Sequence, residues 1–571
     1  MMIFDRLPRF TRDERFLVPL GAIAFAIVFC WPLLGNLSTP GTMMDWDLSL
    51  EFLWVACRTI LKYHQLPLWN PYKCGGMPMF ANLQAHISMP FFLLPLIFGP
   101  FLGAHLEVIV RLAVAWAGGY VLGRVLKIRP LGALTVATVF AASSWFYLKI
   151  AAGHLMALEF TWAPWAFAAA WMAADRYAFR YAALAGAVLA LIFLGNGPNP
   201  LMVTAVAIAA VLLGDACVRQ SPKPVWILGA VALFTVGFSM VRLVPAFLLS
   251  LQYPRPTADI EVDNLPVLLI AMFSRRQELF RGLPNGWGFW EGGAYIGIFA
   301  LPAALGVMRP RRAAPWIIAG TLLILLARGD AEPFSVWPAV HKLPLVSSLR
   351  LPSRFLVAFT LVVGVMAGFG IDWLSARWRP WSALIAAAII VIAAVDCLLV
   401  GPPSLDTLLQ YPANPRPAAA VFHQIRHGSG NGNMLVSAME NTGVVDCYDY
   451  TQWNTNVAGA GDPGYRGEQY LAGPGAINLA QWSPNAITYD VDVPSASEII
   501  VNQNYSRWWR VAAGQGVAVD HDGLIGVRIP AGRQHLKLAY RDYSMLVGAL
   551  ASIATLAIAL GIARRESRPT C

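Results

Sequence analysis

Residues 355–373 read FLVAFTLVVGVMAGFGIDW, an almost unbroken apolar run. A helix made from such a run is long enough to cross the hydrocarbon core of a membrane, which is about 30 Å thick. Similar runs recur along the chain of 571 residues, of which 57% are hydrophobic and 13% are charged. Soluble domains carry about 25% charged residues. The composition therefore excludes a soluble globular protein and predicts a polytopic α-helical membrane protein.

Twelve apolar runs predict about twelve transmembrane helices. Their approximate bounds are 16–34, 103–125, 130–147, 155–173, 181–195, 199–218, 224–248, 291–307, 313–328, 355–373, 381–400 and 544–562. Alternate connections are short and basic, and lysine and arginine mark cytoplasmic segments. The basic residues are Arg6, Arg9, Arg12 and Arg15 before the first run, then Lys127, Arg129, Arg176, Arg180, Arg219, Lys223, Arg309, Arg311, Arg312, Arg377 and Arg379, and Arg564, Arg565 and Arg568 in the tail. This pattern predicts a bacterial inner-membrane protein with both termini in the cytoplasm, and no nucleic-acid partner is needed to explain the net charge of +10.

The long connections all fall on the opposite, extracytoplasmic side, at 35–102, 249–290, 329–354 and 401–543. Residues 1–400 are predicted to form the transmembrane domain, with 35–102 as its first outer loop, and 544–571 the last helix and a basic tail. Within 401–543, runs such as AITYDVDV at 486–493 alternate as strands do. We therefore expect an extracytoplasmic β-sandwich or jelly roll. Its tryptophans, which would either fill the core or stack on sugar rings, are Trp453, Trp482, Trp508 and Trp509.

The first outer loop contains the densest group of polar candidates. Residues 45–61 predict an amphipathic helix lying along the membrane interface. Asp45 and Asp47 stand at its start, where the helix dipole stabilises carboxylates, and Glu51 shares a face with Asp47. Taken alone, the two aspartates fit a helix cap as well as a site. Residues 89–98 are short and interrupted by proline, which predicts a re-entrant or interfacial piece.

Ionisable residues within the apolar runs predict a polar cavity that opens to the outer face, because charges inside a bilayer usually face a cavity or one another. Glu107 and Arg111 are four residues apart on one helix and can pair. The other members of this set are Glu159, Arg242, Glu291 and Asp396.

Three further groups lie near the predicted mouth of this cavity. His154 is next to a span and could join Asp45 or Asp47 in holding a divalent cation such as Mg or Mn, or simply form hydrogen bonds. Arg350 and Arg354 suit a phosphate, since guanidinium groups bind its oxygens in pairs, or they could anchor lipid headgroups. Cys57 and Cys74 share the first loop, so a disulfide between them is possible in an oxidising compartment.

Several motifs in the chain resemble those of the C-type (GT-C) membrane glycosyltransferases, and more closely the bacterial YfhO-like family. In the first loop these are Asp47, Glu51, Leu68-Trp69-Asn70-Pro71, Gly76-Met77-Pro78 and Pro90. Further along they are LRLPSRF at 349–355, NYSRWWR at 504–510, Pro530-Ala531-Gly532 and Tyr540, so the resemblance covers nearly the whole chain. Glu51 stands where the family usually has glutamine, and Trp508-Trp509 stands where it usually has Gly-Trp.

The resemblance implies an inverting GT-C-type glycosyltransferase of the hexosyltransferase class. Its donor would be a polyprenyl-phosphate sugar and its acceptor a glycan, lipid or protein of the cell envelope. Asp47 would be the general base, with Asp45 or Glu51 orienting the acceptor. His154 and Glu159 would complete the acidic acceptor cluster, while Arg350 and Arg354, and secondarily Arg242, would stabilise the departing phosphate.

Two other classes of protein stay open at this point. A lipid-linked saccharide transporter or flippase would use the same outer cavity without a base. A non-catalytic envelope assembly protein would act through its β-rich domain. A soluble nucleotide-sugar donor is disfavoured, because the sequence holds no phosphate-binding loop of the form GxxxxGK followed by Ser or Thr.

Overall fold

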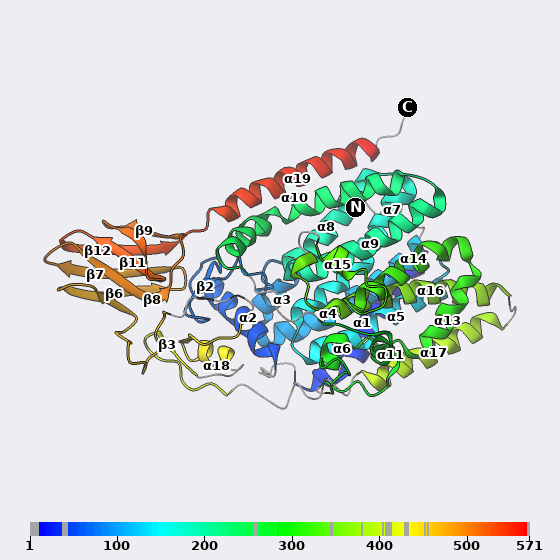
Figure 1. Cartoon of the computed structure of the whole chain (residues 1–571), viewed down its shortest axis with the longest axis horizontal. Coiled ribbons are helices and arrows are strands. Elements are labelled where there is room, and N and C mark those ends of the chain that lie inside the picture. The colour runs from blue at the N-terminus through cyan, green and yellow to red at the C-terminus, as the bar shows by residue number, and fades with distance from the viewer. Residues whose placement is uncertain are drawn as a thin grey trace.

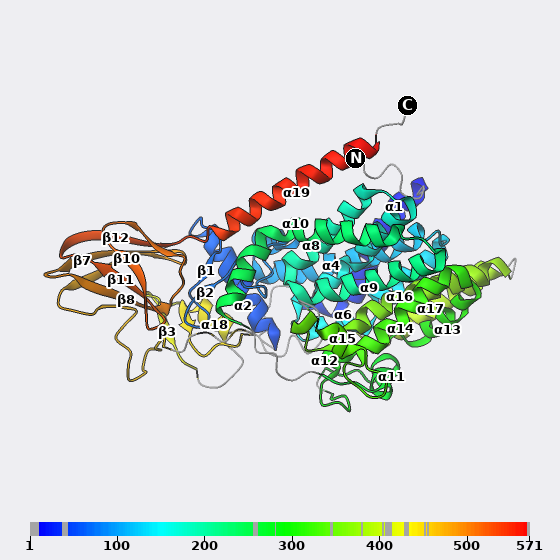
Figure 2. The ribbon, with the colours of Figure 1, turned by 45° about the horizontal axis from the view of Figure 1, so that its top comes forward.

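The computed structural model describes residues 11–36, 44–254, 261–279, 281–342, 346–377, 381–401, 405, 414–427, 433–449, 451, 453 and 456–567. Four of the predicted cytoplasmic residues, Arg6, Arg9, Arg379 and Arg568, lie outside this part of the chain. The chain forms a large helical domain with a β-rich domain at one end of it (Figure 1, and turned in Figure 2). The predicted combination of a polytopic helical domain and a C-terminal β-rich domain is therefore confirmed.

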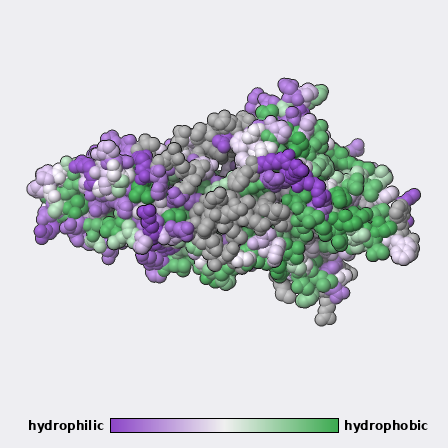
Figure 3. All heavy atoms as spheres, turned by 90° about the horizontal axis from the view of Figure 1, so that it is seen from below, coloured by the Kyte–Doolittle hydropathy of each residue, from purple (hydrophilic) through white to green (hydrophobic). Residues whose placement is uncertain are grey.

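Within the described residues, eight helical segments are long and apolar enough to cross a membrane. They are α4 (Pro100–Val125), α5 and α6 (Pro130–Ala141 and Ser144–Ala151), α9 (Pro198–Arg219), α10 (Lys223–Gln252), α14 (Pro310–Ala327), α16 (Phe355–Arg377), α17 (Ser382–Val400) and α19 (Ser544–Ser567). Three further predicted spans correspond to α1 (Arg12–Phe29), α7 (Ala163–Arg176) with the preceding 3-10 segment Leu155–Trp162, and α8 (Phe179–Asn196). Hydrophobic residues cover much of the helical half of the surface in Figure 3.

The prediction of one continuous span over 291–307 is wrong. The chain there breaks into α12 (Phe289–Gly292), the 3-10 segment Gly297–Phe299, and α13 (Ala300–Leu305). Gly297 adopts φ +49°, which favours glycine and interrupts a helix. The carboxylate of Asp396 accepts hydrogen bonds from the Tyr295 hydroxyl (2.8 Å) and the Ile298 N–H (3.4 Å) at this break.

The turns predicted to be cytoplasmic gather at one end of the helical domain. Asp175 forms ion pairs with Lys127 (3.4 Å) and Arg219 (3.2 Å), which joins three of these turns. At the same end, Glu566 of α19 accepts the N–H groups of Phe179 and Arg180. The start of α1 lies beside the end of α4, because Glu14 pairs with Arg124 at 3.0 Å. The described parts of the two terminal helices thus lie on the side of the basic turns.

The long connections meet at the opposite end. The N–H of Glu261 donates to the carbonyl of Arg350 (2.9 Å), and the N–H of Asp263 donates to the carbonyl of Arg328 (2.9 Å). The first outer loop reaches both this region and the β-rich domain. Its predicted short piece is helical, as 3-10 segment Pro90–Phe92 followed by α3 (Leu93–Phe98), which packs on α4.

The C-terminal domain is an antiparallel β-sandwich of two four-stranded sheets. One sheet has the order β10-β11-β8-β5 and the other β6-β7-β12-β9. The strands are β5 (Gln469–Leu471), β6 (Ala476–Ser483), β7 (Ala486–Val493), β8 (Ser497–Asn504), β9 (Trp509–Ala513), β10 (Val517–His521), β11 (Leu524–Ile529) and β12 (Gly532–Tyr540). Alternate residues of these strands fill a core that includes Trp509, whereas Trp453, Trp482 and Trp508 are half-buried.

The first outer loop contributes a tryptophan to this sandwich core. Its hairpin of β1 (Trp69–Asn70) and β2 (Met77–Pro78) inserts Trp69, which is fully buried, beside the rings of Trp509 and Tyr540. The Trp69 indole N–H donates to Gln503 Oε1 at 2.8 Å. Gly76 adopts φ +95° against this ring, where a Cβ would approach Trp69 to 2.9 Å. The Leu-Trp-Asn-Pro motif is therefore a docking element between the two domains.

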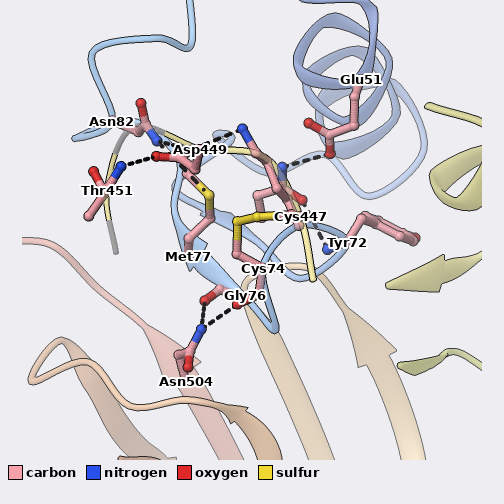
Figure 4. The surroundings of a disulfide bond; sticks show 12 residues. Glu51, Tyr72, Cys74, Gly76, Met77, Asn82, Cys447, Asp449, Thr451 and Asn504 are labelled. Atoms are coloured by element: carbon pink, nitrogen blue, oxygen red, sulfur yellow. Dashed lines mark hydrogen bonds and ion pairs between the residues drawn. A yellow bond between two sulfur atoms is a disulfide. The ribbon is translucent and has the colours of Figure 1, made fainter. Parts of the chain in front are cut away.

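A disulfide and a buried ion pair strengthen the same junction (Figure 4). Cys74 in the hairpin is bonded to Cys447, 373 residues later in the chain. Lys73 Nζ lies 2.9 Å from Asp449 Oδ2, and both side chains are at most 1% exposed. The suggested Cys57–Cys74 bond is wrong, because Cys57 is a free, buried thiol in α2 (Asp45–Leu61).

Because the disulfide joins Cys74 to Cys447, a cut in the chain between these residues should leave the two fragments covalently linked. A protease site introduced into the exposed segment 414–418 should yield two fragments that stay together on a non-reducing gel and separate after reduction. Cys74→Ser should separate them without a reductant. Cys57→Ser is the control and should leave them joined; fragments that separate in the unreduced wild type would contradict the Cys74–Cys447 bond.

Candidate functional site

The start of α2 is fixed to the turn that follows α6. The N–H of Asp45 donates to the Ala152 carbonyl (3.1 Å), and the Trp46 indole N–H donates to the Ile150 carbonyl (2.7 Å). Gly153 in this turn adopts φ +75°, and a Cβ there would lie 2.1 Å from the Trp46 nitrogen. Only glycine therefore allows α2 to approach so closely, and this approach sets Asp45 beside His154.

Five charged or titratable side chains meet at this point, and we call them the Glu291 cluster: Asp45, Lys149, His154, Glu291 and Arg354. Asp45 Oδ2 lies 3.3 Å from His154 Nε2, and His154 Nδ1 lies 3.8 Å from Glu291 Oε1. Lys149 Nζ donates to Glu291 Oε2 at 2.5 Å, and Arg354 Nη2 donates to Glu291 Oε1 at 3.3 Å. Segments far apart in the sequence thus build one continuous chain of polar contacts.

The cluster has an accessible edge and a buried centre. The side chains of Asp45 and Arg354 are 24% and 23% exposed, whereas those of Glu291 and Lys149 are 6% and 1% exposed. The Asp45 carboxylate at one end and the Arg354 guanidinium at the other are therefore partly exposed. The ion pair between Lys149 and Glu291 lies behind the surface.

The protonation of the cluster follows from its contacts. Burial alone would raise the pKa of Glu291, but Lys149 and Arg354 outweigh burial and hold that pKa well below its usual range. Burial and the nearby Lys149 ammonium lower the pKa of His154 despite the opposing charge of Asp45, so the imidazole is neutral near pH 7. With its proton on Nε2, His154 donates to Asp45 while Nδ1 accepts from Lys149 Nζ at 3.5 Å.

Asp47 does not join this cluster. Its two carboxylate oxygens accept the N–H groups of Met434 (2.9 Å) and Leu435 (3.0 Å), the first residues of α18 (Met434–Met439), and the residue is 1% exposed. Asp47 thus caps a helix 387 residues later in the chain. The general base expected at Asp47 does not fit this geometry, because both oxygens are occupied and shielded from an acceptor.

Glu51 lies in the same domain junction as Asp47. It is fully buried, and its Oε1 accepts from the Asn70 side-chain amide at 2.8 Å (Figure 4). Burial raises the pKa of Glu51 to about 7, although Lys73 and Asn70 oppose the shift. The predicted position of this helix along the membrane interface is corrected as well. Residues 46–53 of α2 are buried without a break, and the helix packs on α18 and α4.

Glu159 and Arg242 have structural partners elsewhere in the bundle. Arg111 pairs with Glu107 (2.8 Å), as predicted, and also with Glu159 (2.7 Å), so Glu159 does not lie with His154. The guanidinium of Arg242 donates to four backbone carbonyls, those of Phe80, Asn82, Ala85 and Leu194. Arg242 therefore secures the return of the first loop, and its donors are not free for a phosphate.

Of the two predicted phosphate-binding arginines, Arg354 belongs to the Glu291 cluster. The backbone of Arg350 accepts the Glu261 N–H, but among the described residues no hydrogen bond or ion pair joins its guanidinium to the cluster. Of the three residues predicted to hold a cation, Asp45 and His154 lie together, whereas Asp47 faces α18. Among the described residues no group of three or more His, Cys, Asp or Glu side chains is arranged to hold a metal.

Sequence reasoning missed Lys149 and the role of Glu291. Lys149 lies at the end of an otherwise apolar stretch, FYLKIA at 146–151. A lone lysine in such a stretch is costly to bury and usually has a charged partner. The sequence could therefore have predicted that Lys149 forms a buried ion pair. Glu291 was expected to face the outer cavity, but its pairing with Lys149 spans 142 residues and leaves no trace in the local pattern.

A comparison with protein-family models finds no match, and neither does a comparison with curated proteins. Among solved structures, the chain is similar to the arabinofuranosyltransferase AftD from Mycobacteria, with 15% identity and a TM-score of 0.44. It is also similar to the archaeal oligosaccharyltransferase AglB from Archaeoglobus fulgidus, with 13% identity and a TM-score of 0.44. The matches cover 70% and 76% of this chain, but 27% of AftD and 65% of AglB. Because both TM-scores lie below 0.5, any function must be argued from this chain itself.

The buried Glu51 predicts a pH-dependent stability. The folded protein binds this proton more tightly than the unfolded chain does, because the pKa rises from its model-peptide value near 4.5 to about 7. The contribution of Glu51 to stability is therefore largest below pH 4.5 and falls by up to about 3 kcal/mol as the pH rises to 7. Glu51→Gln should reduce this fall and raise the melting temperature at pH 7.5. The pH dependence of the melting temperature is measured by thermal unfolding in detergent from pH 5 to 8. The control is Glu332→Gln, because Glu332 is exposed. A pH profile in Glu51→Gln that matches wild type would contradict the prediction.

Proposed function

We propose that this protein is a membrane glycosyltransferase that transfers a hexose from a polyprenyl-phosphate donor to an acceptor of the cell envelope. The observation that carries the proposal is the contact path from Asp45 through His154, Lys149 and Glu291 to Arg354. It brings a carboxylate and a guanidinium to the accessible edge of one cluster. Inverting transfer needs these two groups on opposite sides of the anomeric carbon. The resemblance of the first loop and of LRLPSRF to GT-C enzymes supports the same proposal.

In this mechanism Asp45 is the general base. Its oxygen takes the proton of the acceptor hydroxyl while that hydroxyl oxygen forms a bond to the anomeric carbon. The bond between the anomeric carbon and the phosphate oxygen breaks, and its electron pair leaves with the polyprenyl phosphate. Neutral His154 orients Asp45 by donating from Nε2. Arg354 and Lys149 stabilise the charge that grows on the phosphate.

We place this site on the extracytoplasmic side of a bacterial inner membrane. The basic turns at the other end of the helical domain favour the cytoplasm for that end. A disulfide between the first loop and the C-terminal region fits an oxidising compartment. A lipid-linked donor is the appropriate substrate there, because nucleotide sugars are cytoplasmic.

A reconstituted transfer assay tests the proposal. Purified protein in vesicles is incubated with radiolabelled polyprenyl-phosphate hexose and an envelope extract, and the label in the extract is measured. Wild-type protein should transfer the label, and Asp45→Asn should lower the rate at least about 100-fold because general-base catalysis contributes that much. The melting temperature of Asp45→Asn should stay within a few degrees of wild type, since Asp45 is partly exposed.

Asp47→Asn is the matched comparison, two residues away on the same helix. Asparagine keeps only one of the two acceptor oxygens, so this change should lower stability by about 1.5–3 kcal/mol and leave turnover per folded molecule close to wild type. The opposite result, with Asp47→Asn inactive and Asp45→Asn active, would contradict the assignment of the base. Movement of the labelled lipid across the vesicle without transfer would indicate a flippase, and neither event would indicate a non-catalytic assembly protein.

A further inference from the structure

We propose that Glu291 is a built-in counter-ion that matches the phosphate site to the donor and promotes release of the product. This inference rests on the proposed function, because it assumes that the donor phosphate binds at Arg354. Glu291 does not touch the reacting atoms in this account. It acts through the charge of the two cations that it contacts.

Glu291 occupies the place where an anionic ligand of this site would be expected. Its Oε2 accepts from Lys149 at 2.5 Å, and Arg354 Nη2 lies 3.3 and 3.4 Å from Oε1 and Oε2. A phosphate oxygen binds lysine and arginine with the same geometry. The carboxylate therefore partly neutralises a pair of cations that would otherwise be held close together with nothing between them.

The charges of the Glu291 cluster cancel. Lys149 and Arg354 contribute +2, Glu291 and Asp45 contribute −2, and neutral His154 adds nothing, so the net charge is zero. A polyprenyl-phosphate sugar is a phosphodiester with a charge of −1. After transfer, the polyprenyl phosphate is a monoester with a charge of about −1.5 to −2 near pH 7. A cluster with no net charge gives the product dianion no Coulomb advantage over the donor monoanion, and the dianion loses more hydration when it enters the site.

No neighbouring carboxylate can replace Glu291 in this role. Glu261 is the next acidic group, but its Oε2 accepts the Ser353 N–H (3.0 Å) and its Oε1 faces the Asn285 amide (3.4 Å). Asp45, at the other end of the cluster, contacts His154 and takes up the proton released in the reaction. Only Glu291 touches both cations among the described residues.

The unmodified protein should discriminate between a monoanionic and a dianionic lipid phosphate. Inhibition of transfer is measured with polyprenyl phosphate, which is a dianion, and with its methyl ester, which is a monoanion. The methyl ester should inhibit more strongly, although it carries less charge. An ordinary cationic pocket would prefer the dianion, so stronger inhibition by polyprenyl phosphate would overturn the inference.

Glu291→Gln should reverse this preference. Without the Glu291 carboxylate the cluster carries a net charge of +1, so the inhibition constant of polyprenyl phosphate should fall about tenfold or more relative to the donor KM. Product release should then limit kcat. Asp396→Asn is the matched control, because Asp396 is a buried carboxylate facing Arg275 and Tyr295 outside the cluster. It should leave the ratio of the two constants unchanged.

The outcomes separate this inference from the proposed function. If wild-type protein neither transfers the sugar nor is protected against thermal unfolding by either lipid, the proposed function is wrong. If it transfers the sugar but prefers the dianion, only the role of Glu291 is wrong. Should Glu291→Gln fail to fold, the comparison of the two lipids with wild-type protein still decides the question.

Discussion

The burial of Trp69 in the core of the β-sandwich is the contact on which the position of the first outer loop depends. Replacing a buried tryptophan by alanine typically costs about 3–5 kcal/mol. The Lys73–Asp449 pair and the Cys74–Cys447 bond then fix the hairpin around it. Because α2 leads directly into this hairpin, the sandwich holds one end of α2 while the turn at Gly153 holds the other.

This arrangement explains why the acidic residues of the first loop divide between two tasks. Successive helical residues are rotated by about 100°, so Asp45 and Asp47 point roughly 200° apart, whereas Asp47 and Glu51 are only about 40° apart. With α2 lying between the helical domain and α18, Asp45 faces His154 and Asp47 faces α18. One turn of helix therefore serves the candidate chemistry on one side and domain docking on the other.

The sequence predicted elements that have a local signature. The helix over 45–61, the Glu107–Arg111 pair, the one-sided basic turns and the β-rich domain all follow from periodicity, spacing or charge, and they are confirmed. It could not predict contacts between distant segments, such as Trp69 with Trp509, Cys74 with Cys447 or Lys149 with Glu291. Helix geometry predicts that Asp45 and Asp47 lie on opposite faces of their helix. Which of them faces the helical domain depends on α18, which begins at residue 434 and cannot be placed from the local pattern. The break at Gly297 depends on Asp396, a hundred residues away.

The most direct measurement is a cryo-electron microscopy structure in a lipid nanodisc with a non-cleavable polyprenyl phosphonate analogue of the donor. The phosphonate should contact Arg354 at the accessible edge of the cluster, with the anomeric carbon facing the open side of the Asp45 carboxylate. A phosphonate bound beside Arg242, or a sugar that lies against α18 and Asp47, would contradict it.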